Sequence, residues 1–178
     1  MMPKGGLGER ISAAEFVEVS RLPVRLVLDN IRSGQNVGAC FRSADAFRID
    51  GLDLCGITCL PPHRDILKSA LGSSDHVPWN AHEQTVDAVA SLQSEGWKVA
   101  AVEQAPESVA LDQWFPRPDE KWALVLGNEV RGVSNDVLAM VDAVIEMPQY
   151  GVKQSINVSV CAGVYLWHAS SCLRGQSQ

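Results

Sequence analysis

The chain has 178 residues, of which 46% are hydrophobic and 20% charged, as is typical of a single globular domain. No run approaches the roughly 18 apolar residues that a membrane span needs, and the start, MMPKGGLGER, lacks the apolar core of a signal peptide. We therefore expect a cytoplasmic protein without a membrane partner. The net charge of −6 argues against a protein that simply coats nucleic acid.

The charge is unevenly distributed along the chain. Residues 1–70 hold 9 of the 15 basic groups against 8 of the 21 acidic ones, so the remainder carries the negative excess. A polyanionic partner would therefore meet the first third of the chain.

The cysteines and histidines do not form a metal-binding pattern. The five cysteines include no Cys-x-x-Cys pair and no histidine at ligand spacing, so we expect reduced core residues and no bound metal. The set is Cys40, Cys55, Cys59, Cys161 and Cys172. The four histidines fall in no motif and receive no role.

The first third of the chain alternates helix and strand patterns. Ser12 and Glu15 form a capping-box pattern, which predicts a short helix within an N-terminal extension, 1–22. Residues 24–29 form a continuous apolar run of the kind buried in a parallel sheet. Asn36 is then expected to cap a helix. Its apolar face comprises Val37, Cys40, Phe41 and Ala44, and Arg42 lies off that face.

The alternation continues to the end of the chain and predicts a single α/β domain, 1–178, with a mostly parallel sheet and helices on both faces. Strands are expected at 52–57, 97–103, 121–127 and 143–147, and a short extended piece at 77–79. Helices are expected at 65–71, at 83–95 with Gly96 ending it, and from Ser134 through Met140.

The segment 145–167 leads into a helix that is apolar on every side. Such a helix has to be buried, so we expect it in the core or in a subunit interface. Ser155, Asn157 and Ser159 place polar groups at alternating positions within it, which indicates a functional site.

Three strands end in unusual loops: DNIRSGQN, GNEVRGVS and PQYGVKQSIN. Ligands of parallel sheets bind beyond such strand ends, although each loop alone is also explained as a tight turn with a capping residue. Neither the dinucleotide fingerprint G-x-G-x-x-G nor the phosphate loop G-x-x-x-x-G-K-[ST] occurs, so NAD and ATP sites have no specific support.

Taken together, three stretches resemble the motifs of the SpoU (TrmH-like) branch of the SPOUT superfamily of S-adenosylmethionine-dependent RNA methyltransferases. They are LVLDNIRSGQNVGACFRSADAF at 26–47, LVLGNEVRGVS at 124–134 and MPQYGVKQSINVSVCAG at 147–163. The resemblance covers most of 24–168. It implies a C-terminal α/β trefoil knot, with 145–173 as the knot and dimer segment, and a homodimer that acts on tRNA or rRNA.

The resemblance also implies roles for individual residues. S-adenosyl-L-methionine is expected to bind bent in the knot, held mainly by backbone groups. Its expected contacts are Val102, Gly127, Asn128, Gly132, Met147, Gly151, Ser155 and Ile156. The expected catalytic residues are Arg42, Asn36, Glu129, Ser155 and Asn157. The implied reaction is methyl transfer to a ribose 2′-hydroxyl of RNA.

The role of Arg42 is open between general base and electrostatic positioning. Arginine stays protonated in proteins, so we favour positioning of a phosphate or of the hydroxyl. Structural alternatives also stand for the other residues. Asn36 and Ser155 would serve as helix caps, and Glu129 would pair with Arg131 or Arg42.

The chain departs from the family pattern at a few positions. Gln149 stands where Met is common, Ile156 and Cys161 replace Leu and Ala, and Arg48 stands where Gly is common. We expect no separate N-terminal RNA-binding domain, so arginines of this domain are expected to contact RNA: Arg21, Arg25, Arg32, Arg48 and Arg64. The alternatives are methylation of a base nitrogen and a non-catalytic dimeric RNA-binding protein of the same fold.

Overall fold

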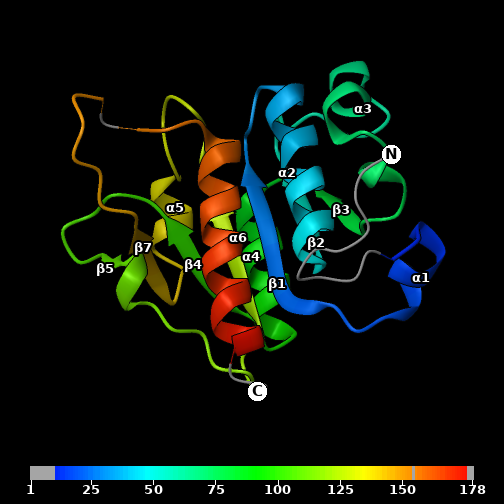
Figure 1. Cartoon of the computed structure of the whole chain (residues 1–178). Coiled ribbons are helices and arrows are strands. Elements are labelled where there is room, and N and C mark those ends of the chain that lie inside the picture. Colours follow the sequence, from blue (N-terminus) through cyan, green and yellow to red (C-terminus); the bar gives the residue numbers. More distant parts are fainter. Residues whose placement is uncertain (1–10, 154, 176–178) are drawn as a thin grey trace.

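A computed structural model describes residues 11–153 and 155–175. In these residues a parallel sheet of seven strands forms the centre of the molecule, in the order β3-β2-β1-β6-β4-β7-β5 (Figure 1). The strands are β1 Leu22–Asp29, β2 Ile49–Cys55, β3 Trp79–His82, β4 Lys98–Val102, β5 Val109–Ala110, β6 Trp122–Leu126 and β7 Ala143–Glu146. Every pair of neighbouring strands is parallel. The predicted α/β class is confirmed.

Helices cover both faces of this sheet, as predicted (Figure 1). Successive residues of a strand point to opposite faces, so Leu26 and Leu28 join one core cluster and Val27 joins the other. Helices α2 Gly34–Phe47, α3 Arg64–Ala70 and α6 Val158–Gly175 pack in the first cluster. Helices α4 Thr85–Ser94 and α5 Asn135–Leu138 pack in the second.

The short elements lie at the margins of the domain. Helix α1 Ala13–Glu18 begins at the predicted capping box, in which Ser12 and Glu15 bond each other's backbone N–H groups. The single-turn 3₁₀ helices are η1 Ser73–Asp75 and η2 Leu111–Gln113. Strand β5 was not predicted, because its two residues carry no pattern and are held in the sheet only by pairing with β7.

The order of the strands forces the chain to cross over itself. Strand β6 fits between β1 and β4, which precede it in the sequence, and β7 then lies beyond β4. Helix α6 returns from β7 to pack against α2 and β1. A C-terminal knot requires this return of α6. That the C-terminal segment is threaded through a loop of the preceding chain stays a prediction.

Two sequence-based expectations about helix starts are wrong. Ser33, rather than Asn36, caps α2, because its hydroxyl accepts the Asn36 N–H at 3.3 Å. Asn157 does not lie one turn inside the terminal helix but just before it, exposed, and its Oδ1 accepts the N–H groups of Ser159 at 2.8 Å and Val160 at 3.4 Å. Both asparagine side chains are thereby placed at helix starts, facing loops.

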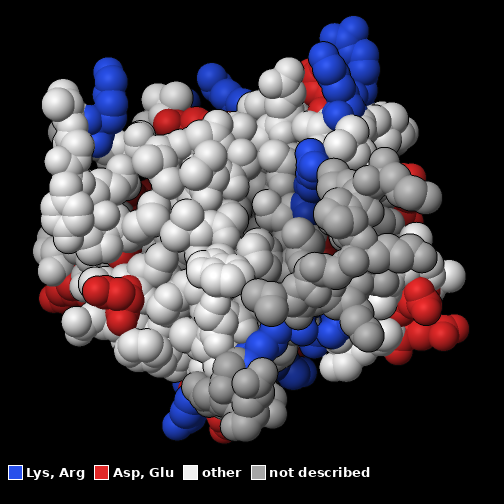
Figure 2. Space-filling model, in the orientation of Figure 1, with Lys and Arg blue, Asp and Glu red and all other residues white. Residues whose placement is uncertain are grey.

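The terminal helix α6 is covered by the core of a single chain on one face only, so its predicted burial in a subunit interface stays a prediction. The inner face of α6 is buried through Ala162, Leu166 and Ala169. Its outer face exposes Val160 and Trp167, the latter to 66%. In Figure 2 most of the surface over α6 is white.

Arg25 lies in the middle of β1 and is only 8% exposed. Its Nε donates to Asp53 at 2.8 Å, and its Nη1 donates to Asp50 at 2.8 Å. Asp53 also contacts Asn80 and the His82 ring. The expectation that Arg25 binds RNA is therefore corrected: two carboxylates already neutralise its guanidinium inside the fold.

Among the described residues, none of the helices combines the length and the hydrophobicity needed to cross a membrane.

We expect Arg25→Ala to destabilise the domain by about 3 kcal/mol, because Asp53 would be left buried without its cation. Urea unfolding followed by circular dichroism measures this change. The matched control is Arg64→Ala, whose side chain is 93% exposed, and for which a change within about 0.5 kcal/mol is expected. Equal effects of the two substitutions would contradict the structural role of Arg25.

Candidate functional site

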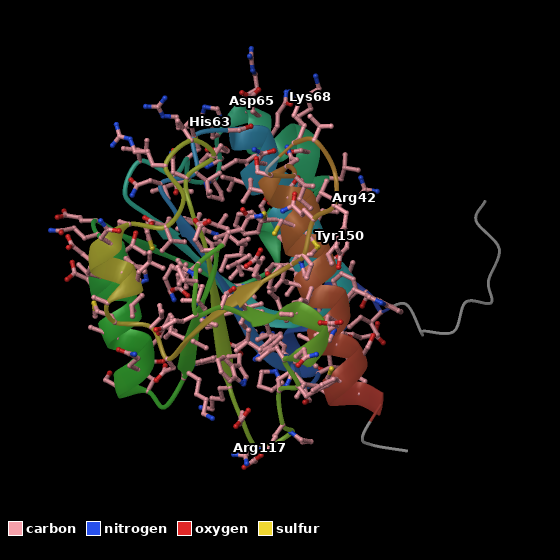
Figure 3. All side chains as sticks on the ribbon, turned by 90° about the vertical axis from the view of Figure 1, so that its left-hand side faces the viewer. Arg42, His63, Asp65, Lys68, Arg117 and Tyr150 are labelled. Carbon is pink, nitrogen blue, oxygen red and sulfur yellow. The ribbon has the colours of Figure 1, made fainter. Side chains whose placement is uncertain are left out.

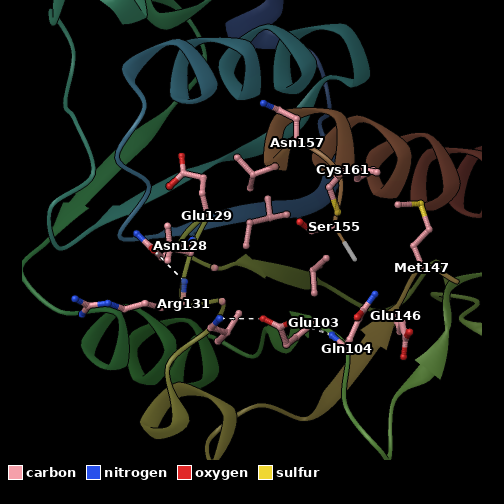
Figure 4. Close-up of a pocket in the computed structure, with 18 of the residues that line it drawn as sticks. Glu103, Gln104, Asn128, Glu129, Arg131, Glu146, Met147, Ser155, Asn157 and Cys161 are labelled. Atoms are coloured by element: carbon pink, nitrogen blue, oxygen red, sulfur yellow. Dashed lines mark hydrogen bonds between the residues drawn. The ribbon is translucent and has the colours of Figure 1, made fainter. Parts of the chain in front are cut away.

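A cavity of about 780 Å³ opens at the carboxyl ends of β4, β6 and β7 (Figure 4). Its walls are the end of β4, the turn 127–133 after β6, and the segment from Met147 to the start of α6. Seven of the eight residues predicted to hold a cofactor line it: Val102, Gly127, Asn128, Gly132, Met147, Ser155 and Ile156. The eighth, Gly151, is exposed and does not line the cavity.

The turn after β6 is held by its own backbone and by Asn128. The N–H of Asn128 donates to the Gly132 carbonyl at 3.1 Å, and the reverse bond is 2.8 Å. The Asn128 side chain accepts the N–H groups of Val130 and Arg131 and donates to the carbonyl of Asn30 at 2.7 Å. Asn128 thus shapes the turn and fastens it to the end of β1.

The two glycines of this turn are required by backbone contacts. A Cβ at Gly127 would lie 2.2 Å from the carbonyl carbon of Gly132 and from the nitrogen of Val133. Gly132 has φ +68°, and a Cβ there would meet the carboxylate of Glu103 at 2.2 Å. Close packing of the turn on itself therefore explains both residues.

Three of the predicted catalytic residues form one hydrogen-bonded chain. Glu129 accepts the Asn36 side-chain amide at 3.0 Å and the backbone N–H groups of Arg32 at 3.2 Å and Ser33 at 3.4 Å. Asn157 donates to Asn36 Oδ1 at 3.0 Å. The three predicted loops therefore meet at one edge of the sheet, although Asn36 of the first loop lies 93 residues before Glu129 and 121 residues before Asn157 in the sequence.

The surroundings of Glu129 favour its ionised form. Partial burial acts to raise the pKa, but hydrogen bonds from its own backbone N–H, from Asn36 and from the backbone of Arg32 and Ser33 together lower the pKa below its ordinary value. No ion pair between Glu129 and an arginine occurs within the described ranges. The alternative that Glu129 pairs with Arg131 or Arg42 therefore finds no support in the geometry.

Arg42 does not reach this cavity in a single chain. It is six residues after Asn36 on α2, which turns its side chain about 120° away. It is exposed and lies in a separate groove between α2 and α3, beside Phe47 and Lys68 (Figure 3). The structure thus joins Asn36, Glu129 and Asn157, places Ser155 in the cavity wall, and leaves Arg42 outside.

The other arginines predicted to contact RNA differ in their surroundings. Arg32 and Arg64 are exposed. Arg21 lies over the Phe16 ring at 5.9 Å. Arg48 ends α2 in a left-handed conformation near Arg174, whose pKa is lowered first by burial and then by the charge of Arg48.

Several lining residues were missed by sequence reasoning. Glu103 and Arg131 lie in the cavity wall, and so do Cys161 and Tyr165 of α6. Tyr165 donates its hydroxyl to the Ile145 carbonyl at 2.8 Å and so fixes α6 to β7. Burial, and next the charge of Glu103, raise the pKa of the Cys161 thiol to about 11. The available signal was position alone, since Glu103 is the last residue of the strand predicted at 97–103.

No group of three His, Cys, Asp or Glu side chains in the described part of the chain is arranged to hold a metal ion.

Gly127→Ala should distort the turn, because its Cβ would clash with backbone atoms that cannot rotate away. We expect a loss of about 1–3 kcal/mol in the free energy of unfolding and faster hydrogen exchange at 128–133. The control is Gly151→Ala, since a Cβ there meets nothing within 4 Å, and unchanged or slightly increased stability is expected. Similar behaviour of the two variants would contradict the packing role of Gly127.

Because the folded pKa of Glu129 lies below its unfolded value, its contacts stabilise the fold above the unfolded pKa and are lost as the pH falls through the folded pKa. An acid titration followed by the NMR signals of the Asn36 side-chain amide should therefore show a midpoint below 4.5. Glu129→Gln should abolish this transition. A midpoint at or above 4.5, or a transition that survives in the variant, would refute the assignment.

The chain matches the model of the SpoU rRNA Methylase family over residues 23–167. It is 32% identical over 146 residues to an uncharacterized tRNA/rRNA methyltransferase of Archaeoglobus fulgidus, covering 82% of this chain and 63% of the relative. It is 33% identical over 143 residues to the 23S rRNA (guanosine(2553)-2′-O)-methyltransferase of Bacillus subtilis, covering 80% of this chain and 56% of the relative.

A solved structure, the AdoMet-bound rRNA methyltransferase from Sinorhizobium meliloti, superposes with a TM-score of 0.76 and 25% identity. The match covers 85% of this chain and 60% of that one, so this chain spans less than two thirds of the length of each of these proteins. The family model covers most of the fold and all three segments that line the cavity. The chain therefore belongs to the SpoU rRNA methylase family.

Proposed function

We propose that this protein is an S-adenosylmethionine-dependent RNA methyltransferase that modifies a ribose 2′-hydroxyl of tRNA or rRNA. The observation that carries the proposal is the convergence of Glu129, Asn36 and Asn157 beside a cavity lined by the turn 127–133. The similar protein of Bacillus subtilis is named a 2′-O-methyltransferase, and the similar structure from Sinorhizobium meliloti holds AdoMet.

The cavity fits a nucleoside-sized cofactor. Its volume of about 780 Å³ is within the range of roughly 300–1,000 Å³ usual for small-molecule sites. Gly127 and Gly132, which have no side chain, line it together with the apolar residues Met147 and Ile156. S-adenosylmethionine supplies an activated methyl group when bound. The residues of the chain then have to orient the acceptor hydroxyl, exclude water and help to move one proton.

The hydrogen-bonded chain suits this orienting role. Asn36 uses its amide nitrogen on Glu129 and its oxygen on Asn157, so the side-chain amides are fixed in direction. Asn157 is exposed at the rim of the cavity, next to Ser155. These polar groups can bind the ribose hydroxyls of a nucleotide that enters from the rim.

In a homodimer, a second copy of the chain covers the exposed face of α6 and brings Arg42 to the cavity. On the outer face of α6, Val160, Val164 and Trp167 lie at positions i, i+4 and i+7, so they form one exposed apolar stripe. Burial of this stripe in a homodimer removes it from water. The groove that holds Arg42 lies on the neighbouring helix α2, so the same dimer can bring Arg42 to the cavity of the partner.

Arg42 fits electrostatic positioning better than proton abstraction. Its guanidinium remains charged at any working pH and presents a fork of N–H donors suited to a phosphate. Together with exposed Arg32 and Arg64, it would hold the RNA backbone and leave sequence recognition to other contacts. Cellular RNA as substrate also agrees with the cytoplasmic location expected from the sequence.

The experiment that tests the function is transfer of labelled methyl groups to total RNA from cells that lack the gene, followed by mapping of the modified nucleotide. Label on a ribose 2′-oxygen is the expected result. Label on a base nitrogen would replace the proposal with a base methyltransferase. Complete absence of transfer with folded, cofactor-binding protein would favour a non-catalytic RNA-binding role.

If each site combines Arg42 of one copy with Asn157 of the other, two inactive variants should complement each other. Arg42→Ala and Asn157→Ala homodimers are each expected to lose at least about tenfold in rate. Mixing them under subunit exchange should restore about a quarter of the wild-type activity per total protein, because half of the dimers then carry one intact site. Absence of restoration, with heterodimers shown by native mass spectrometry, would place Arg42 in its own chain's site.

A further inference from the structure

Glu103 is a carboxylate in the cavity wall that the proposed methyl transfer does not use. It follows β4 directly and is half-buried beneath the turn 127–133 (Figure 4). One oxygen accepts the Val133 N–H at 3.1 Å, and the other accepts the Gln104 N–H at 2.9 Å. Each carboxylate oxygen can accept about two hydrogen bonds, so both retain capacity for a ligand.

The charged groups of the cavity wall are unbalanced. Among the described lining residues they comprise Glu103, Glu129 and Glu146 against a single cation, Arg131. No ion pair within the described ranges joins any of these four groups. A cavity with this lining favours a ligand that carries positive charge.

The other two glutamates are already engaged by fixed side-chain donors. Glu129 is bound by Asn36 and by the start of α2, at the rim. Glu146 accepts the Ser108 hydroxyl at 2.7 Å. Glu103 has backbone donors only, lies deeper under the turn, and its charge acts on Cys161 of α6 across the cavity. It is therefore the carboxylate best placed to act on a bound ligand.

We propose that Glu103 determines cofactor specificity by charge: its carboxylate favours the cationic methyl donor over the neutral product of the reaction. The inference rests on the proposed function. S-adenosylmethionine carries a sulfonium, an ammonium and a carboxylate, a net charge of +1. After transfer of the methyl group the sulfonium becomes a thioether, and S-adenosylhomocysteine has no net charge. A negative wall thus weakens product binding relative to donor binding without contacting the methyl group.

The hydrogen bond to Val133 is what keeps this charge in place. The carboxylate is pinned against Gly132, where any side chain would displace it. Glu103 thus has two roles: its hydrogen bond holds the turn, and its charge acts in the cavity. Two substitutions distinguish these roles. Glu103→Gln keeps an oxygen acceptor for Val133 and removes the charge, whereas Glu103→Ala removes both.

The test is isothermal titration of the full-length protein with S-adenosylmethionine and with S-adenosylhomocysteine, at low and at high salt. Glu103→Gln should weaken binding of the donor about five- to tenfold, the effect of one unit charge across a partly solvated cavity of this size. Binding of the product should change less than twofold. The control is Glu107→Gln, an exposed carboxylate four residues on that does not line the cavity, and no change in either affinity is expected.

The outcomes separate the inference from the function on which it rests. A selective loss of donor affinity that shrinks at high salt supports the role of Glu103. Equal losses for both ligands in Glu103→Gln, with an intact unfolding midpoint, would reduce Glu103 to a structural clamp and overturn the inference. Unchanged affinities would overturn it as well. If the wild-type protein binds neither compound, the proposed function itself fails.

Discussion

The carboxylate of Glu129 is the contact on which the site depends. It receives the backbone N–H groups at the start of α2 and the amide of Asn36, and so ties the turn after β6 to the loop after β1. Asn36 passes the connection on to Asn157 at the start of α6. Three loops that are independent in sequence thereby become one rigid edge, because each hydrogen bond fixes the direction of the next donor.

The sequence predicted the elements of this fold well and their contacts less well. Apolar runs such as 121–127 identified buried parallel strands, since burial on both faces leaves few alternatives. Helix starts were less certain because Ser33 and Asn36 are both good caps, and only the geometry of the loop decides between them. The resemblance to a family supplied the site residues, yet the linkage of Asn36 to Glu129 needed coordinates. No local pattern reports a contact across 93 positions.

The glycines of the motifs have a second structural reason besides the approach of a cofactor. Gly127 and Gly132 were expected because a cofactor approaches backbone, and both do line the cavity. In the structure the turn itself also requires them, because a Cβ at Gly127 would clash with the backbone of Gly132 and a Cβ at Gly132 would clash with Glu103. Gly151, a glycine of the third motif at 147–163, has open space around it. A glycine in a motif therefore identifies a site only when its neighbours are known.

The terminal helix links the fold to assembly. Its inner face joins the core through Tyr165 and Leu166, and its apolar outer face remains in contact with water in a single chain. A helix that is apolar all round is stable only if both of its faces are covered. The sequence indicated such a helix, and one chain covers only one of its faces. The expected role of Arg42 also requires a second copy, because Arg42 lies on the adjoining helix α2 and its side chain is turned away from the cavity of its own chain. A single partner, a second copy packed on α6 and α2, would meet both requirements.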